Sequence, residues 1–514
     1  MPQNKDPVDT EIYGWITVAI GDISEVKGGK RLPKGSEYSS TITAHPYIRV
    51  TDFNNGTINT SDLRYIEKEI HQKISRYVIS KSDVYISIAG SIGISGTIPV
   101  ELDGSNLTEN AAKIELPEEI LAKFIHYQFC SSKIQNAIRQ STISTTQPKL
   151  ALFRIKDLEI GIAPIAEQTR IVTAIESFQQ RSARARALLA EVRPALENLR
   201  QSILQAAFSG RLTADWRAKN PDVEPADQLL ARIRTERRQR WETDQLEKFK
   251  AKGKKPPKNW KDKYKEPEPV DDSELSELPE GWCWASVEQV GRVESGQTPK
   301  GCDNRHSDDG EVPWFRVGDM NSEGNEEILR SAEITLSLDD VATLKLHVRP
   351  AGTIVFPKRG GAIATNKKRV LGQPSAYDLN TMGVVPLISG SLSGYLWWWF
   401  QSIDLAKLAD GGVILQINHG DIAPLTIPVA PESEMNAIVR VLQECNDRLN
   451  AVYASVSAME SSLLQLDQSI LSKAFRGELV PQDPHDEPAA DLLARIRATR
   501  EAVETKKKTT RKKS

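Results

Sequence analysis

Apolar and small residues recur at alternating steps of four and three along the segment that begins at Ile171. Such a heptad pattern is typical of a helix that buries one stripe of side chains against a partner helix. The pattern returns from Ile438, at an offset of 267 in the numbering, even where the letters have changed. At 1.5 Å per residue, each stripe predicts a rod of roughly 50 Å. The expected seam positions are Ile171, Ile175, Phe178, Leu189, Val192, Leu199, Ile203, Ile438, Leu442, Val456, Leu463, Leu466 and Ile470.

Two apolar stripes of equal length predict that the two rods pack on each other as a coiled coil. The first rod leaves the first globular segment and the second rod leaves the second, so the rods must run antiparallel if the two segments lie at opposite ends. The alternative is that each helix packs on its own domain. A proline inside a helix costs about 3 kcal/mol and tends to kink it. We therefore expect a bend at Pro194, whose counterpart in the second rod is Ser461.

The end of the first rod, QSILQAAFSGRL from Gln201, is nearly copied by QSILSKAFRGEL from Gln468. The offset is again 267, so the repeat extends beyond one helix. After the rods the offset becomes 263, since EPADQLLARIR from Glu224 returns as EPAADLLARIR from Glu487. Two homologous halves therefore fill nearly the whole chain. Other residues at the offset of 267 are Gly14 with Gly281, Trp15 with Trp282, Tyr47 with Trp314, Pro164 with Pro431, and Glu167 with Glu434.

Short β-branched runs alternate with glycine clusters in two segments, near 12–163 and 279–430. This composition is typical of mixed α/β domains. One helix in each segment, from Leu121 and from Ser393, carries aromatic residues that we expect in the core rather than stacked on bases. The predicted fold class is α+β, with two globular mixed α/β domains separated by two long helices that form an antiparallel coiled coil, and a pseudo-two-fold internal repeat. The expected segments are a first domain at 12–163, a helical region at 164–237, a charged linker at 238–278, a second domain at 279–430, a second helical region at 431–500 and a basic tail at 501–514.

Composition places the 514 residues among ordinary globular proteins, with 39% apolar and 26% charged residues. The most apolar cluster, YLWWWF from Tyr395, is too short to cross a membrane, and the polar first residues do not resemble a signal peptide. We therefore expect a cytoplasmic protein. The four cysteines are scattered and predict neither disulfides nor a zinc site. Phosphate-loop, zinc-protease and adenine-methylation motifs do not occur in the sequence, so we expect no catalytic residue, no metal site and no cofactor in this chain.

The distribution of charge is more informative than the net charge, which is −2 and by itself suggests no polyanionic partner. Basic runs begin at Lys248 and Lys506, and an acidic run begins at Glu266. We interpret these runs as a solvated linker and a frayed tail.

Glycine-rich loops with basic residues are the places where this chain could contact nucleic acid. Glycine lets backbone amides approach a phosphate, and lysine or arginine supplies the charge. The loop PKRGGAIATNKKR from Pro357 is strongly basic, whereas its counterpart IAGSIG from Ile88 carries no charge. Divergent loops on a repeated scaffold are expected if two domains read two targets. The DNA-binding candidates are Lys30, Arg31, Lys34, Arg49, Thr51, Asn54, Ser91, Gln147, Lys149, Gln297, Lys300, Arg316, Lys358, Arg359, Lys367, Lys368, Gln416 and Asn418.

Arg49 and Arg316 occur at equivalent places in the two halves, each three residues before an aspartate. A guanidinium there could contact a phosphate or a guanine edge. Alternatively, it could pair with the aspartate, Asp52 or Asp319, and hold a turn.

The sequence combines two divergent globular domains with two duplicated helical regions. Its most specific motifs are the FSGRL and FRGEL endings and the helix entry PIAEQTRIV from Pro164. It resembles the specificity subunit of a type I restriction-modification system, and the resemblance covers almost the entire chain. The second helix entry, PESEMNAIV from Pro431, departs by losing the Gln-Thr-Arg core.

The resemblance implies that each globular segment is a target recognition domain that reads one half of a bipartite, asymmetric sequence in double-stranded DNA. It also implies that the helices set the spacer and dock two methyltransferase (modification) subunits, with restriction subunits in the full complex. S-adenosylmethionine, ATP and Mg²⁺ are then expected in the partner subunits. The docking candidates are Gln201, Phe208, Gly210, Gln468, Phe475 and Gly477. The alternatives are a self-contained DNA-modifying enzyme, and a two-headed DNA-binding or structural spacer protein without a methyltransferase partner.

Overall fold

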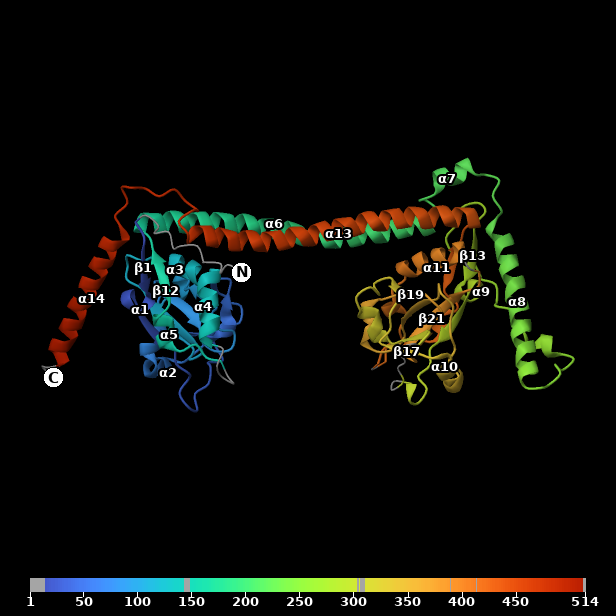
Figure 1. Cartoon of the computed structure of the whole chain (residues 1–514), viewed down its shortest axis with the longest axis horizontal. Helices are drawn as coiled ribbons and strands as arrows, with labels where there is room; N and C mark the ends of the chain where they lie inside the picture. The colour runs from blue at the N-terminus through green and yellow to red at the C-terminus, as the bar shows by residue number, and fades with distance from the viewer. Residues whose placement is uncertain are drawn as a thin grey trace, which may run out of the picture. The chain divides into compact units, whose positions relative to one another are not determined.

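The computed structural model describes residues 14–142, 148–302, 305, 310–388, 390–412 and 414–511, with side chains as far as residue 502. The chain divides into two compact units. Unit 1 consists of residues 1–191 and 456–514, and unit 2 consists of residues 192–455. Both long helices, α6 (Ile165–Phe208) and α13 (Glu432–Ala474), therefore contribute one part to each unit (Figure 1).

The globular part of unit 1 is built on two four-stranded sheets and two small strand pairs. One sheet has the order β2-β11-β8-β9 and is antiparallel throughout, and the other has the order β6-β3-β10-β7 with a parallel pair β3-β10. The strands are β1 (Ile16–Ala19), β2 (Glu25–Gly28), β3 (Pro46–Ile48), β4 (Phe53–Asn54), β5 (Thr57–Ile58), β6 (Arg64–Tyr65), β7 (Val78–Ile79), β8 (Val84–Ser87), β9 (Ser95–Thr97), β10 (Ser105–Leu107), β11 (Ala111–Glu115) and β12 (Glu159–Ile162).

The helices of unit 1 cover the antiparallel sheet and close its core. Phe124 and Phe129 of α3 are fully buried, which confirms that the aromatic face of this helix belongs to the core. The helices are α1 (Ile20–Ile23), α2 (Lys68–Lys73), α3 (Ala122–Phe129), α4 (Ser132–Thr142), α5 (Leu152–Lys156) and, from the second half of the chain, α14 (Ala489–Arg511). Leu492, Leu493 and Ile496 of α14 belong to the same apolar core as α3.

Unit 2 has a five-stranded sheet of order β14-β21-β18-β19-β16 and a three-stranded sheet of order β17-β15-β20. The strands are β13 (Cys283–Ser286), β14 (Gly291–Ser295), β15 (Val312–Phe315), β16 (Ile328–Leu329), β17 (Ile334–Leu336), β18 (Ile354–Pro357), β19 (Arg369–Leu371), β20 (Ala376–Tyr377), β21 (Thr381–Pro386) and β22 (Thr426–Val429). The helices are α7 (Ala214–Lys219), α8 (Ala226–Ala251), α9 (Val287–Val290), α10 (Leu338–Leu344), α11 (Ser391–Ser402) and α12 (His419–Ile422). Tyr395, Trp399 and Phe400 of α11 are buried, as predicted for the second aromatic helix.

Equivalent elements recur along the two halves at the offset seen in the sequence. The antiparallel pair β1-β12 of unit 1 matches β13-β22 of unit 2, and both strands are displaced by the same offset of 267. The starts of α6 and α13 differ by the same number, and the starts of α8 and α14 differ by 263. The domains thus have a common strand pair at the point where the chain enters its long helix.

The two long helices run in opposite directions within each unit. In unit 1, the start of α6 shares a core with the end of α13, through Ile171 and Ile470. In unit 2, the end of α6 shares a core with the start of α13, through Leu204 and Ile438. Each helix therefore packs on the other helix and also on the globular domain at that end.

Three of the predicted seam positions are wrong, because Phe178, Leu199 and Leu466 are exposed by 37%, 50% and 47%. At the last of these, Asp467 takes the inward place and its carboxylate lies 2.5 Å from the guanidinium of Arg186. Adjacent helical residues point about 100° apart, so this ion pair turns Leu466 outward. The other positions are buried (Ile171, Ile175, Ile438, Leu442, Val456, Ile470) or half-buried (Leu189, Val192, Ile203, Leu463).

Helix α6 continues through Pro194 as one helix of 44 residues.

Two of the expected segment boundaries fall inside helices. The boundary at 237/238 lies within α8, and the boundary at 500/501 lies within α14. The segment expected to be a charged linker thus begins as the second half of a helix, because apolar residues at the start of α8, Leu229 and Ile233 among them, pack into the core of unit 2.

A buried carboxylate joins the elements at the junction of unit 2. Glu434 of α13 is fully buried and accepts hydrogen bonds from the Trp282 indole at 2.9 Å and the Thr213 hydroxyl at 2.7 Å. The Arg217 guanidinium lies 2.8 Å from the same carboxylate. The Gly281 carbonyl beside this tryptophan accepts the amide of Ala226, which opens α8. Three separate stretches of chain therefore meet at one carboxylate, and α8 is attached to this junction through the neighbouring Gly281.

The junction of unit 1 uses the same places with different partners. The Gly14 carbonyl accepts the amide of Ala489, which opens α14, at 3.0 Å. Glu167 is buried like its counterpart, and burial raises the pKa of its carboxyl. The cation here is Arg170, which lies 2.6 Å from Asp486 rather than on the buried glutamate.

Replacing Glu434 by alanine should destabilise unit 2 by about 3 kcal/mol, because the partly buried Arg217 and the indole lose their shared acceptor. Nine of the ten tryptophans lie within residues 192–455, so urea unfolding followed by tryptophan fluorescence reports mainly on unit 2. The matched control is Glu432→Ala, which removes a carboxylate that is 44% exposed and paired with Arg232. That loss should cost less than about 1 kcal/mol. Equal losses in the two variants would contradict the assigned role of the buried carboxylate.

Candidate nucleic-acid interface

The glycines of the first candidate loop serve close backbone packing. A Cβ atom at Gly29 would lie 2.1 Å from the carbonyl oxygen of Thr108. At the equivalent Gly296 it would lie 2.0 Å from the carbonyl oxygen of Asp378. Both distances are far shorter than a contact allows, so only glycine fits there. These two glycines are therefore explained by the fold, and not by an approach to a phosphate.

The residue after each of these glycines is held by the same two hydrogen bonds. In unit 1, the amide of Lys30 donates to the Leu107 carbonyl at 2.8 Å, and the Tyr47 hydroxyl donates to the Lys30 carbonyl at 2.7 Å. In unit 2, the amide of Gln297 donates to the Tyr377 carbonyl at 2.8 Å, and the Trp314 indole donates to the Gln297 carbonyl at 3.1 Å. The backbone frame is the same in the two units, while the side chain changes from a cation to an amide.

The basic side chains of the unit 1 loop reach the surface. The Lys30 ammonium lies 5.7 Å from the centre of the Tyr77 ring. Arg31 pairs with Glu109 at 2.6 Å although its own side chain is 80% exposed. Lys34 is exposed, and within the described parts of the chain no ion pair engages it. This loop therefore presents three cations to solvent, one of them already paired.

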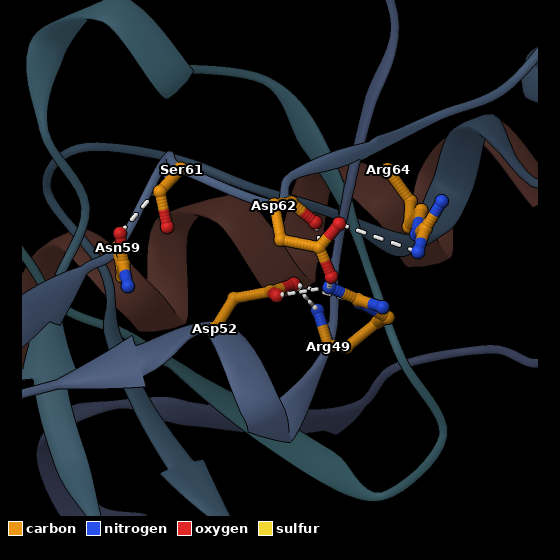
Figure 2. A network of polar contacts seen from close by, with 6 residues as sticks. All are labelled: Arg49, Asp52, Asn59, Ser61, Asp62 and Arg64. Atoms are coloured by element: carbon orange, nitrogen blue, oxygen red, sulfur yellow. Dashed lines mark hydrogen bonds and ion pairs between the residues drawn. The ribbon is translucent and has the colours of Figure 1, made fainter.

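Arg49 holds a turn. Its guanidinium lies 2.6 Å from Asp52 and 3.2 Å from Asp62, and its backbone amide donates to Asp52 at 2.7 Å (Figure 2). The Asp52 carboxylate is 3% exposed. Asp62 also binds Arg64 at 3.3 Å, as Figure 2 shows. Of the two interpretations of this arginine, the structure favours the internal pair that stabilises the turn.

Arg316 occupies the equivalent turn in unit 2. Its backbone amide donates to the Asp319 carboxylate at 2.7 Å, as at the equivalent turn of unit 1. Its guanidinium, however, pairs with Glu333. The aspartate thus caps the turn in both units. The arginine forms an ion pair in both, with Asp52 in unit 1 and with Glu333 in unit 2.

Two loops that are distant in sequence meet at the same place in each unit. In unit 1, Ala89 pairs with Lys149, and the amide of Leu150 donates to the Ile88 carbonyl at 2.9 Å. The neighbouring Ser91 is exposed.

In unit 2, Arg359 pairs with Gln416, and the amide of Ile417 donates to the Lys358 carbonyl at 2.9 Å. Gln416 follows Lys149 at the offset of the repeat, so the two bridges are equivalent. Each bridge carries one cation, but on opposite strands of the bridge: Lys149 in unit 1 and Arg359 in unit 2.

Polar side chains gather around the unit 2 bridge. The Lys358 ammonium donates to the Ser295 hydroxyl at 3.0 Å, and partial burial lowers the pKa of this lysine. The Gln416 amide donates to Asn418 at 2.7 Å, and the Asn418 amide donates to Asp410 at 3.2 Å. The result is a group of two cations with two exposed amides, a combination suited to phosphate and base-edge contacts.

Two of the other basic candidates are less available. Lys368 is 3% exposed, and its ammonium donates to the Asn366 side chain at 2.8 Å and to the Ile403 carbonyl at 2.5 Å. Burial lowers its pKa to about 8. Its assignment to the DNA surface is therefore wrong, since the side chain is used to hold a loop. Lys367 is half-buried and donates to Asn321.

The remaining candidates fall into three groups. Thr51, Asn54 and Lys300 are exposed. The Gln297 side chain is engaged internally, because its oxygen accepts the amide of His347 at 2.9 Å. Gln147 lies outside the described residues. Sequence reasoning missed Ser295 and Asp410, which have no signal of their own and belong to the group only through contacts between loops.

The repeated helix endings hold the end of each long helix to the globular domain of the other half of the repeat, not to the domain that precedes the helix. The Phe208 ring packs against Tyr395 at 5.2 Å, and the Phe475 ring packs against Phe124 at 5.7 Å. Gly210 and Gly477 have φ values of +71° and +70°, as expected for a glycine that ends a helix. These phenylalanines are therefore internal anchors. Docking of a partner stays a prediction for the exposed Gln201 and Gln468.

Within the described residues, no group of three or more histidine, cysteine, aspartate or glutamate side chains could hold a metal ion. None of the described helices has the length and apolarity that a membrane span requires.

Comparison with known proteins identifies the family. Residues 13–193 match the type I restriction modification DNA specificity domain. The chain is 35% identical over 198 residues to the EcoBI specificity subunit of Escherichia coli, an alignment that covers 37% of this chain and 41% of that one. It is 24% identical to the EcoDI specificity subunit of Escherichia coli, and that alignment covers both chains completely.

Solved structures show the same fold. A chain from a type I restriction-modification complex superposes with a TM-score of 0.65 at 19% identity, covering 93% of this chain and 100% of that one. The HsdS subunit of Thermoanaerobacter tengcongensis gives a TM-score of 0.53 at 19% identity, covering 91% of this chain and 98% of that one. From the matched domain and the full-length relative together, the chain belongs to the specificity subunits of type I restriction-modification systems.

Proposed function

We propose that unit 1 and unit 2 each read one half of an interrupted, asymmetric DNA sequence. The observation that carries this proposal is the different position of the cation in two equivalent bridges. In unit 1 it is Lys149, and in unit 2 it is Arg359 on the opposite side of the bridge. Arginine can donate two parallel hydrogen bonds to a guanine edge, whereas lysine acts as a flexible point charge. The same backbone frame would thus present different donors from different positions, as two unlike half-sites require.

The chain itself would supply recognition without catalysis. Type I family membership leads us to propose two methyltransferase subunits as partners, which would bring S-adenosylmethionine, and restriction subunits that would bring ATP and Mg²⁺. Apolar side chains on both long helices support a protein partner, since Leu188 on α6 and Leu464 on α13 are 58% and 63% exposed. We infer that the complex acts in the cytoplasm, where it meets DNA.

The long helices are proposed to set the spacer between the two half-sites. Each helix is continuous and has residues in both units. A continuous helix is stiff on this length scale, so its residue count is a physical measure of distance.

A two-headed DNA-binding or spacer protein without a methyltransferase partner is the competing function. It would share the recognition loops but would not retain a modification subunit. Purification of the full chain from its host, followed by identification of the proteins that remain bound, separates the two functions.

Exchange of residues 12–163 for the corresponding segment of another family member should change one half of the recognised sequence and leave the other half unaltered. The expectation follows from the separate cores and separate loops of the two domains. Methylome sequencing of a host that carries the chimeric complex measures both halves at once. A chimera that altered both halves would contradict the separation of the two recognition functions.

Single substitutions at the two bridges give a finer test. Lys149→Ala should relax the sequence preference in one half-site by about 1–3 kcal/mol, and Arg359→Ala should do the same in the other. Lys219→Ala, which removes an exposed lysine at the end of α7, is the control and should leave both halves unchanged. Binding competition with duplexes randomised in one half at a time measures the effect. If both bridge variants relaxed the same half-site, the assignment of one bridge to each half would be refuted.

Insertion of four residues after Leu189 tests the proposed spacer function of the helices. The insertion lengthens α6 by about 6 Å and adds about 40° of rotation beyond a whole turn. A shift of register would move one reading domain by nearly two base pairs of about 3.4 Å each. We expect weakened modification or a longer preferred spacer, with both half-site sequences unchanged. Methylome sequencing decides this, and an altered half-site at an unaltered spacer would refute the idea.

A further inference from the structure

Residues 241–265, which follow the anchored part of α8 and are here named the basic hairpin, fold back on themselves through an aromatic cluster. The rings of Trp241 and Trp260 stack at 5.8 Å with an angle of 17° between their planes. Tyr264 lies 5.3 Å from Trp241, and Phe249 lies 6.3 Å from Trp260. Four aromatic residues thus close a segment that composition alone classed as a solvated linker. Figure 1 shows the chain turning back after α8.

Polar contacts complete the turn. Gly253 has a φ of +63°, and the amide of Lys254 donates to the Phe249 carbonyl at 2.9 Å, which ends the helix. The Lys261 ammonium lies in the returning segment, in the short 3-10 helix Trp260–Lys263, and is 2.7 Å from Glu242 on α8. Arg238 lies over the Tyr264 ring at 5.7 Å. The hairpin is therefore a built element and not a chance turn in a flexible linker.

The hairpin stands on a fixed base. Leu229, Leu230 and Ile233 of α8 are buried in the core of unit 2. The Arg237 guanidinium, one turn further, donates to the Glu288 carbonyl and pairs with the Glu288 carboxylate at 3.5 Å. The position of the hairpin within unit 2 is thus set by core packing.

The outer surface of the hairpin is strongly cationic beyond its first helical turns, where residues 241–247 contribute Glu242, Asp244 and Glu247. Residues 248–265 contain nine lysines and one aspartate, and all nine lysines are exposed. Among the described residues, Lys261 is the one of these nine with an ion pair, and the seven carboxylates of the following segment, 266–280, pair with none of them. Unpaired like charges repel one another, so this arrangement costs free energy unless a polyanion neutralises it.

We propose that the basic hairpin binds the phosphate backbone of double-stranded DNA outside the two half-sites, without reading bases. Lysine is depleted at protein–protein interfaces, whose binding energy comes from exposed aromatic and apolar anchors. Here the aromatic residues are turned inward to close the hairpin, which leaves lysine outside. Flexible ammonium groups suit phosphates, whose contacts need charge more than geometry. The proposal rests on the DNA-binding function and adds a third contact that would serve any sequence.

The test uses the full-length chain in its complex with modification subunits. Lys248, Lys250, Lys252, Lys254 and Lys255 are replaced together by glutamine in one variant and by arginine in a matched control that keeps the charge. Affinity is measured against salt concentration for a duplex with the target sequence and for a scrambled duplex of the same length. Thermal unfolding of both variants verifies that the hairpin change leaves the fold intact.

The glutamine variant should lose at least tenfold in affinity at low salt, by the same factor on both duplexes. The slope of log affinity against log salt should become shallower by up to about 4.5, which corresponds to five released phosphate contacts at about 0.9 each. The arginine variant should match the parent protein. An unchanged slope, or an equal loss in the arginine variant, would overturn the proposal. So would retention of DNA affinity together with loss of a modification subunit, because the hairpin would then bind protein. Failure of the parent complex to distinguish target from scrambled DNA would refute the proposed function instead.

Discussion

The packing of one long helix against the other, inside the core of each unit, is the contact on which the other features depend. In unit 1 Ile171, Ile175 and Ile470 belong to one core, and in unit 2 Leu204, Ile438 and Leu442 belong to another. Each fully buried aliphatic side chain contributes about 2 kcal/mol. Because these residues also touch the globular domain, a domain cannot loosen from its helices without exposing its own core. The recognition loops are therefore positioned by the same apolar contacts that hold the helices together.

Periodicity in the sequence could predict the two long helices and most of their buried positions, because apolar residues at heptad spacing need a common buried face. It could not predict the rotation of α13 near Leu466. There the ion pair between Arg186 and Asp467 decides which side faces inward, and a pattern of apolar letters contains no information on that pair. The burial of the two aromatic helices was easier to predict, because large aromatic side chains such as Trp399 and Phe124 are usually buried in a core.

The candidate site was predicted less well from the sequence than the long helices were. Residue type selected Lys149 and Arg359, which lie on exposed bridges, and with equal force selected Lys368, which is buried. The difference is tertiary, because the Lys368 ammonium is occupied by the carbonyl of Ile403, which lies on a separate loop. The equivalence of the two bridges likewise depends on contacts between loops that are far apart in the sequence, which no local pattern records.

Unit 1 is assembled from two stretches of chain, residues 1–191 and 456–514, whereas unit 2 is continuous. A ribosome therefore completes all of unit 2 before it has made the piece that closes unit 1, although it began unit 1 first. Until residues 470–496 emerge, the core that they fill, with Leu492, Leu493 and Ile496 of α14 among its members, is open to solvent. A chain that stops short then carries one finished domain beside one unfinished domain. Because of this order of synthesis, unit 1 can complete its core only after the second stretch has been made. The folding of unit 1 therefore depends on synthesis of the last part of the chain.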